Sequence, residues 1–142
     1  MERQEFLRLL GTASIAVCAG CSLESCSNDS GGAVPAAPTG VDFTLDLSMT
    51  ANAILTSDGG FLYKSGIIVV CLNATAKTYV AVSQACTHQG TTVSFQSSSS
   101  QFVCPAHGSR FSSSGTVVQG PAASSLHQYN TSLTGTNLRV FS

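Results

Sequence analysis

Charge is scarce in this chain of 142 residues, in which Lys, Arg, Asp and Glu together make up 9% and the formal net charge is −1. A protein that binds nucleic acid needs a basic surface for the phosphates, so we expect no nucleic-acid partner. The chain also lacks tryptophan, and it has no run of the roughly 18 apolar residues that a membrane-spanning helix needs. Its length suits one domain with a buried core.

Apolar residues are plentiful at 43%, and they stand among abundant Ser, Thr and Gly. Apolar and polar residues alternate over 41–47, which is typical of a half-buried strand, and the apolar run at 67–72 predicts a strand buried on both faces. We expect further strands at 78–82, 92–95, 101–103, 116–118 and 137–141. No ten-residue segment beyond residue 40 has the period of a helix, so the sequence predicts an all-β domain over residues 41–142.

The start of the chain has the parts of a secretory signal. Residues 1–21 combine basic residues, a short apolar stretch and small residues. Their end, Ala19-Gly20-Cys21, resembles a bacterial lipoprotein signal, which implies that Cys21 carries lipid and becomes the mature N-terminus. Cys18 departs from that pattern, because such signals usually have Leu there. We therefore predict a leader over 1–21 and a lipid anchor in the membrane.

The export route and the role of this start stay open. Residues 3–8 also resemble a twin-arginine signal, a route that exports proteins already folded around a cofactor, with Gln4 in place of the second arginine. The general secretory path is the other export route, and the segment could instead be an amphipathic helix without a targeting role. After the leader, residues 22–40 have the Ser, Gly and Pro composition of a flexible linker.

Two short cysteine–histidine pairs are the most informative feature of the chain. Cys86 and His88 have the spacing C-x-H, Cys104 and His107 have C-x-x-H, and 15 residues separate His88 from Cys104. A predicted hairpin around the serines at 97–100 lies between the pairs and would bring them together as adjacent loops. Thiolates and imidazoles are metal ligands, so the four side chains form a candidate metal site.

This order of ligands resembles the Rieske iron–sulfur family, and the resemblance extends over roughly residues 80–130. It implies an antiparallel β sandwich with a cluster-binding subdomain of two ligand loops, and one [2Fe–2S] cluster per chain. Cys86 and Cys104 would ligate one iron as thiolates, and His88 and His107 would ligate the other as imidazoles. Because imidazoles are neutral, such a cluster accepts an electron more readily than one held by four thiolates.

The resemblance also implies residues that surround the cluster. Gly90 and Gly108 would permit tight turns beside it, and Pro121 lies in a Gly-Pro-Ala segment that looks like the cytochrome bc and b6-f type. In that type a serine and a tyrosine donate hydrogen bonds to sulfur. Ser109 keeps the first donor, whereas Phe111 stands at the tyrosine position.

The sequence departs from the bc and b6-f type at two further positions. Thr91 and Ala106 stand where that type has two cysteines joined in a disulfide. The lack of this bridge resembles the ferredoxin components of aromatic-ring dioxygenases. The chain therefore combines features of both types, and we expect a reduction potential between their extremes.

The motif has three other interpretations. A structural zinc site uses the same ligand types, although it usually pairs like with like. A cysteine-nucleophile hydrolase would leave the second pair unexplained, and the two motif histidines could also be ordinary surface residues. Outside the motif, we expect His127 to be a strand or surface histidine, Cys71 to be a buried apolar residue and Cys26 to be unpaired.

These features predict a one-electron carrier rather than a self-contained enzyme. We expect it to be exported to the bacterial cell envelope, periplasmic or anchored to the membrane. There it would pass electrons between a donor and an acceptor protein and serve an oxidoreductase or a respiratory complex. The alternative is the ferredoxin component of an aromatic-ring oxygenase system, which would be cytoplasmic and would need neither signal nor anchor.

Overall fold

The computed structural model describes residues 33–142, so the predicted leader, Cys18, Cys21 and Cys26 lie outside the described residues. The regular structure of the described part consists of ten strands and one short 3-10 helix, which confirms the all-β prediction. The elements are β1 (Asp42–Asp46), η1 (Thr50–Thr56), β2 (Phe61–Lys64), β3 (Ile67–Asn73), β4 (Thr78–Ser83), β5 (Ser94–Gln96), β6 (Gln101–Val103), β7 (Arg110–Ser112), β8 (Val117–Gln119), β9 (Gln128–Thr134) and β10 (Asn137–Phe141).

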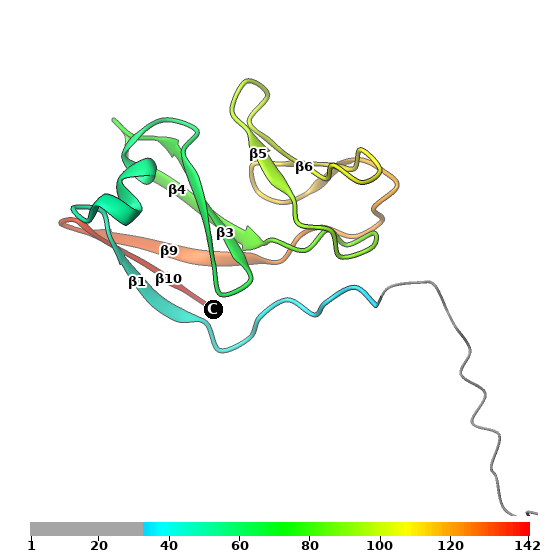
Figure 1. Ribbon diagram of the computed structural model, residues 1–142, viewed down its shortest axis with the longest axis horizontal. Coiled ribbons are helices and arrows are strands. Elements are labelled where there is room, and N and C mark those ends of the chain that lie inside the picture. The colour runs from blue at the N-terminus through cyan, green and yellow to red at the C-terminus, as the bar shows by residue number, and fades with distance from the viewer. Residues whose placement is uncertain (1–32) are drawn as a thin grey trace, which may run out of the picture.

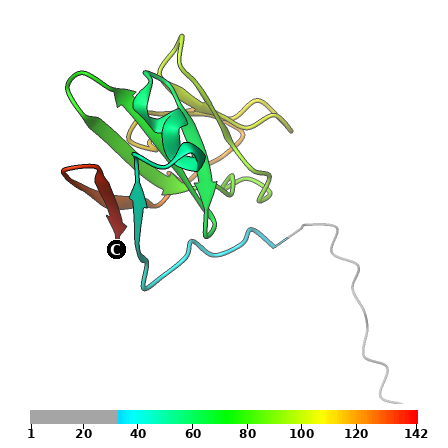
Figure 2. The same cartoon turned by 60° about the vertical axis from the view of Figure 1, so that its left-hand side comes forward.

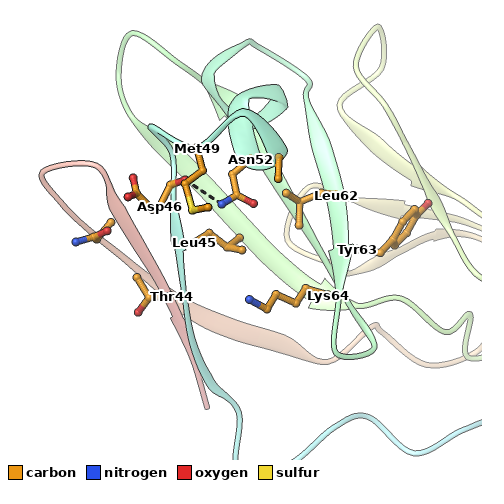
Figure 3. A pocket seen from close by; sticks show the side chains of 10 residues that line it. Thr44, Leu45, Asp46, Met49, Asn52, Leu62, Tyr63 and Lys64 are labelled. Carbon is orange, nitrogen blue, oxygen red and sulfur yellow. Dashed lines mark hydrogen bonds between the residues drawn. The ribbon is translucent and has the colours of Figure 1, made fainter.

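The strands form two antiparallel sheets that lie side by side (Figure 1). The larger sheet has the order β1-β10-β9-β4-β3-β2, and the smaller has the order β5-β6-β7-β8. The larger sheet curls, so its edge strands β1 and β2 lie on either side of a cavity of about 390 Å³ next to η1 (Figure 3). There the Asn52 side chain donates a hydrogen bond of 2.9 Å to the carbonyl of Asp46.

The strand β3 is buried on both faces, as its continuous apolar run predicted. Ile68 and Val70 belong to a core that includes residues of both sheets. Ile67 and Val69 belong to a second core, formed by the larger sheet and η1. Consecutive side chains of a strand point to opposite faces, so a strand that serves two cores is apolar at successive positions.

The predicted hairpin between the two motifs is present. β5 and β6 pair in antiparallel register, with Phe95 opposite Phe102, and the serines at 97–100 form the connection. β4 leads into Cys86 and β6 leads into Cys104, so the hairpin carries the chain from one motif to the other. Both phenylalanines are buried in the core shared by the sheets.

The helix η1 was not predicted. It has seven residues, and only Leu55 among them is buried. A single buried residue leaves no apolar period in the sequence, so pattern analysis cannot detect such a helix. Within residues 33–142, no helix has the length and the apolar character that crossing a membrane requires.

The described residues before β1 follow an extended path along the domain (Figures 1 and 2). They form no helix or strand, but Pro35 and Pro38 lie against the domain at Gly90 and Gly66. The composition of 22–40 predicted a flexible linker, and the structure shows that the last part of this stretch contacts the folded domain. The boundary between linker and domain at residue 40 stays a prediction.

Candidate metal centre

Two loops at one end of the molecule carry the four predicted ligands (Figure 1). We call residues 84–93, which connect β4 to β5, loop 1, and residues 104–109, which connect β6 to β7, loop 2. The rings of His88 and His107 lie edge to face, with their centroids 5.0 Å apart. The fold therefore brings together two motifs that the sequence separates by a hairpin.

The two loops have the same pattern of backbone hydrogen bonds. In loop 1 the N–H of Gly90 donates to the carbonyl of Cys86 at 2.7 Å, and in loop 2 the N–H of Gly108 donates to the carbonyl of Cys104 at 3.0 Å. The cysteine N–H groups donate in turn to the carbonyls of Thr91 and Ser109, both at 2.8 Å. Each loop is thus a closed turn of six residues with the cysteine at its start.

The turn requires glycine at its fifth position. Gly90 has a φ of 78° and Gly108 a φ of 77°, a left-handed conformation that residues with a Cβ rarely adopt. This explains why a glycine follows the histidine in both motifs, as the sequence analysis expected. The histidines occupy different places in the two turns, third in loop 1 and fourth in loop 2.

The sulfur and nitrogen donors differ in exposure. Cys86 is 0% exposed and Cys104 is 2% exposed. His88 is half-buried, and His107 is exposed. Among residues 33–142, no three His, Cys, Asp or Glu side chains gather closely enough to hold a single metal ion. The thiols therefore lie inside the protein, and the imidazoles lie toward its surface.

The pKa of the Cys86 thiol lies above its ordinary value. Burial is the main cause, because it disfavours the thiolate, and the neighbouring Cys104 side chain raises the pKa further. Hydrogen bonds from the backbone of His88 and from the side chain of Ser109 act in the opposite direction. Two buried thiols thus lie next to each other, and the backbone of His88 and the side chain of Ser109 favour the thiolate form of one of them.

An unpaired nitrogen supports metal binding at this place. Nδ1 of His88 is buried and has no hydrogen-bond partner among residues 33–142. A buried polar atom without a partner costs about 1–3 kcal/mol, so such atoms are rare unless a ligand satisfies them. Neutral imidazole nitrogens and thiolates are the donors of a mixed-ligand [2Fe–2S] group. The residues present therefore fit this group.

A third loop, residues 120–126, follows β8 and contacts both ligand loops. The N–H of Ala122 donates a hydrogen bond of 3.0 Å to Oγ of Ser109, which is fully buried. The hydroxyl of Thr87 in loop 1 donates to the carbonyl of Ser124. Loops 1 and 2 are therefore both attached to this third loop by a hydrogen bond.

The other residues expected around the cluster lie as follows. Phe111 is fully buried in the core that also contains Cys86 and Cys104. Pro121 is exposed in the third loop, and the peptide bond before it is cis. Gln119, which the sequence analysis did not single out, donates from its side chain to the carbonyl of Gly108 at 3.2 Å.

Sequence reasoning missed the contacts that attach the third loop. Ala122 and Ser124 take part through a backbone N–H and a backbone carbonyl, which every residue type other than proline offers, so the identity of their side chains gives no signal. Thr87 lies inside the first motif and has a hydroxyl, which is the only local signal that could have suggested such a contact. Ala122 lies 13 residues from its partner Ser109, and Ser124 lies 37 residues from its partner Thr87.

Two residues outside the motif behave as predicted. Cys71 is fully buried in the core of the larger sheet. His127 is exposed just before β9, and its ring lies edge to face on Tyr129 at a centroid distance of 4.8 Å. Neither residue belongs to the two ligand loops.

A β scaffold that presents two cysteine–histidine loops is the architecture of an iron–sulfur protein with mixed ligands. The family model of the Rieske [2Fe–2S] domain matches residues 51–130, more than half of the chain. The chain belongs to the Rieske [2Fe–2S] family, and membership of this family implies a [2Fe–2S] cluster.

Among its relatives are iron–sulfur subunits of the cytochrome b6-f complex. The subunit from Synechococcus sp. (strain CC9605) is 46% identical over 55 residues, which cover 39% of this chain and 31% of that protein. The chloroplastic subunit 1 from Nicotiana tabacum is 42% identical over 59 residues, which cover 42% of this chain and 25% of that protein. The chain thus matches less than a third of the length of either subunit.

Solved structures show the same fold. The plasma membrane Rieske protein of the cyanobacterium Synechocystis PCC 6803 is similar with a TM-score of 0.51 and 33% identity, over 58% of this chain and 84% of that one. The ferredoxin of carbazole 1,9a-dioxygenase from Nocardioides aromaticivorans IC177 has a TM-score of 0.54 at 21% identity, over 73% of this chain and 98% of that one. The second similarity concerns the fold alone.

Proposed function

We propose that this chain is a one-electron carrier of the bacterial cell envelope whose cluster is held by Cys86, His88, Cys104 and His107. The two cysteines would hold one iron as thiolates, and the two histidines would hold the other as neutral imidazoles. The observation that carries the assignment is the pair of matching loops with two buried thiols and the unpaired Nδ1 of His88. When bound, the cluster accepts and releases one electron.

Besides holding the cluster, the cysteine and histidine side chains would have different roles in shielding the site from water and exposing it to a partner. Burial of Cys86 and Cys104 keeps water away from the sulfur side of the site. His107 is exposed, so its ring is the part of the site that a partner protein can approach directly. The site is therefore suited to exchange of electrons at the surface rather than to binding a substrate in a pocket.

The metal content of the purified protein tests this assignment. We expect about two irons and two acid-labile sulfides per chain, with the paramagnetic signal of a mixed cysteine and histidine cluster after reduction. His107→Ala should abolish iron binding, whereas the control His127→Ala should retain it, because His127 is outside both loops. Stoichiometric zinc without iron, in protein made with adequate iron, would contradict the proposal.

We further propose that the protein is exported and held at the membrane by lipid on Cys21. The support is the sequence Ala19-Gly20-Cys21 followed by linker composition. In the native host, the full-length protein should fractionate with membranes, Cys21→Ser should release it, and the control Cys26→Ser should have no effect. An intact Met1 on soluble native protein would contradict export.

The partner we propose is a membrane oxidoreductase or a respiratory complex. The support is the similarity to subunits of the cytochrome b6-f complex and to a plasma membrane Rieske protein. A role as the ferredoxin of an oxygenase system is the second candidate, favoured by Thr91 and Ala106 at the positions of the disulfide. The localisation experiment separates the two, because an oxygenase ferredoxin needs neither export nor an anchor.

A further inference from the structure

The extended segment before β1 is attached to the domain at three points. The hydroxyl of Tyr129 donates a hydrogen bond of 2.8 Å to the carbonyl of Pro38. A Cβ added to Gly66 would lie 2.9 Å from Cγ of Pro38, and one added to Gly90 would lie 2.5 Å from Cδ of Pro35. Both proline rings therefore contact positions where only glycine leaves room. We call residues 33–38 the strap.

The strap lies over the base of loop 1. Its prolines and alanines face Gly66, Ser83, Gln84, Ala85, Gly90 and Thr92 across a cavity of about 280 Å³. In this base, the N–H of Gln84 donates to the carbonyl of Gly66 at 3.0 Å and the N–H of Val93 donates to the carbonyl of Gln84 at 2.8 Å. The strap thus covers the place where loop 1 leaves and rejoins the sheet scaffold.

Among the described residues, no comparable segment lies on the glycine of loop 2. The turn of loop 2 repeats the hydrogen bonds and the glycine conformation of loop 1, but a Cβ added to Gly108 would meet no described atom within 4 Å, leaving out its two chain neighbours. The two glycines therefore experience the same backbone constraint and different surroundings. The difference comes from Pro35 and Val34, which lie on Gly90.

We propose that the strap is a positioning element of the cluster site, which holds loop 1 in its ligand-binding conformation. Prolines suit this role, because a chain with few accessible conformations loses little entropy when it docks. The strap is the end of the predicted linker, so under this proposal the linker also supports the metal site. Undocking of the strap loosens Cys86 and His88 and leaves Cys104 and His107 unaffected. The proposal rests on the proposed ligand assignment.

Hydrogen exchange in the full-length protein tests the strap. In the double variant Pro35→Gly, Pro38→Gly, the amides of Cys86 and Gly90 should exchange several-fold faster, while those of Cys104 and Gly108 keep their rates. The comparison variant Ala36→Gly adds flexibility to the same segment but keeps both rings, so it should speed exchange of the loop 1 amides much less than the double variant does. Equal exchange of the loop 1 amides in parent and double variant would overturn the proposal.

A mutant cycle tests the contact between Pro35 and Gly90. Gly90→Ala and Gly108→Ala introduce the same strain at positive φ, but only Gly90→Ala also displaces the strap. Gly90→Ala should therefore speed cluster loss to a chelator several-fold more than Gly108→Ala does, and this excess should vanish in the double proline variant. An excess that persists there would overturn the proposal. A parent protein without iron would instead contradict the ligand assignment, and amide exchange would still test the strap.

Discussion

At the scale of single residues, Ser109 has two roles that a sequence motif does not separate. Its Oγ accepts the N–H of Ala122, which attaches the third loop, and its side chain also lowers the pKa of the Cys86 thiol. A hydroxyl has one hydrogen to donate and lone pairs to accept, so it can perform both roles at once. The first role is structural, and the second acts on the sulfur.

Ser109→Ala should lower the reduction potential of the cluster, because a hydrogen bond to sulfur stabilises the more negative, reduced state. A bond to a charged group is worth about 1.5–3 kcal/mol, which limits the shift to roughly 65–130 mV. The variant should also lose stability, since the N–H of Ala122 is left unpaired. Protein-film voltammetry measures the potential, and Ser109→Thr, which keeps the hydroxyl, is the control. An unchanged potential in fully loaded Ser109→Ala would show that the sulfur contact has no effect.

Phe111→Tyr should raise the potential by placing a second hydroxyl in the same core as both cysteines. Phe102→Tyr is a matched control, because Phe102 is equally buried and lies opposite Phe111 in the sheet. Voltammetry of the two variants should show an increase only for Phe111→Tyr. A similar increase in both would mean that core polarity, rather than a directed hydrogen bond, sets the potential.

At the scale of elements, β3 connects the stability of the scaffold to that of the site. Its two faces serve different cores, and only the face with Ile68 shares a core with Cys86 and Cys104. Ile67 is equally buried on the opposite face. The same strand therefore offers a matched pair of positions.

Ile67→Ala and Ile68→Ala should each lower the free energy of unfolding by about 2–5 kcal/mol, because each leaves a cavity in a packed core. Only Ile68→Ala should also speed cluster loss under conditions where the protein stays folded. Chemical denaturation followed by circular dichroism measures stability, and visible absorbance follows the cluster. Equal rates of cluster loss in both variants would show that a cavity in either core weakens the cluster site to the same extent.

At the scale of the whole molecule, charge is distributed unevenly. Apart from histidines, Arg110 is the one charged residue in the segment 84–126, which contains the ligand loops and the smaller sheet. The other charged side chains of the described part belong to the larger sheet and its turns, at Asp42, Asp46, Asp58, Lys64, Lys77 and Arg139. A partner that approaches the loops therefore meets a nearly neutral surface.

The rate of electron exchange with a partner protein should consequently change little between low and physiological ionic strength. Pairs that associate through opposite charges lose rate steeply as salt screens them. Stopped-flow measurements across a salt series test this. Gln89→Lys places a charge on an exposed position of loop 1 and should introduce a salt dependence. A steep dependence in the parent would mean that charges of the larger sheet guide docking.

Much of this protein could be predicted from the sequence because the features concerned are local. Each ligand motif is a turn closed within six residues, so its cysteine, histidine and glycine appear together in the chain. The alternation at 41–47 and the apolar run at 67–72 report which faces of a strand are buried, and both strands are present. η1 escaped prediction because it buries one residue.

Tertiary structure alone decided how the loops are held. Ser109 finds Ala122 and Thr87 finds Ser124 across segments that come together only when the third loop docks. Residues 33–38 have the composition of a flexible chain, and nothing within them indicates that they bind the domain. Their docking depends on missing Cβ atoms at Gly66 and Gly90 and on the hydroxyl of Tyr129, 91 residues from its acceptor. Local pattern specifies which side chains can bind metal, whereas the packing of distant segments determines how firmly they are held.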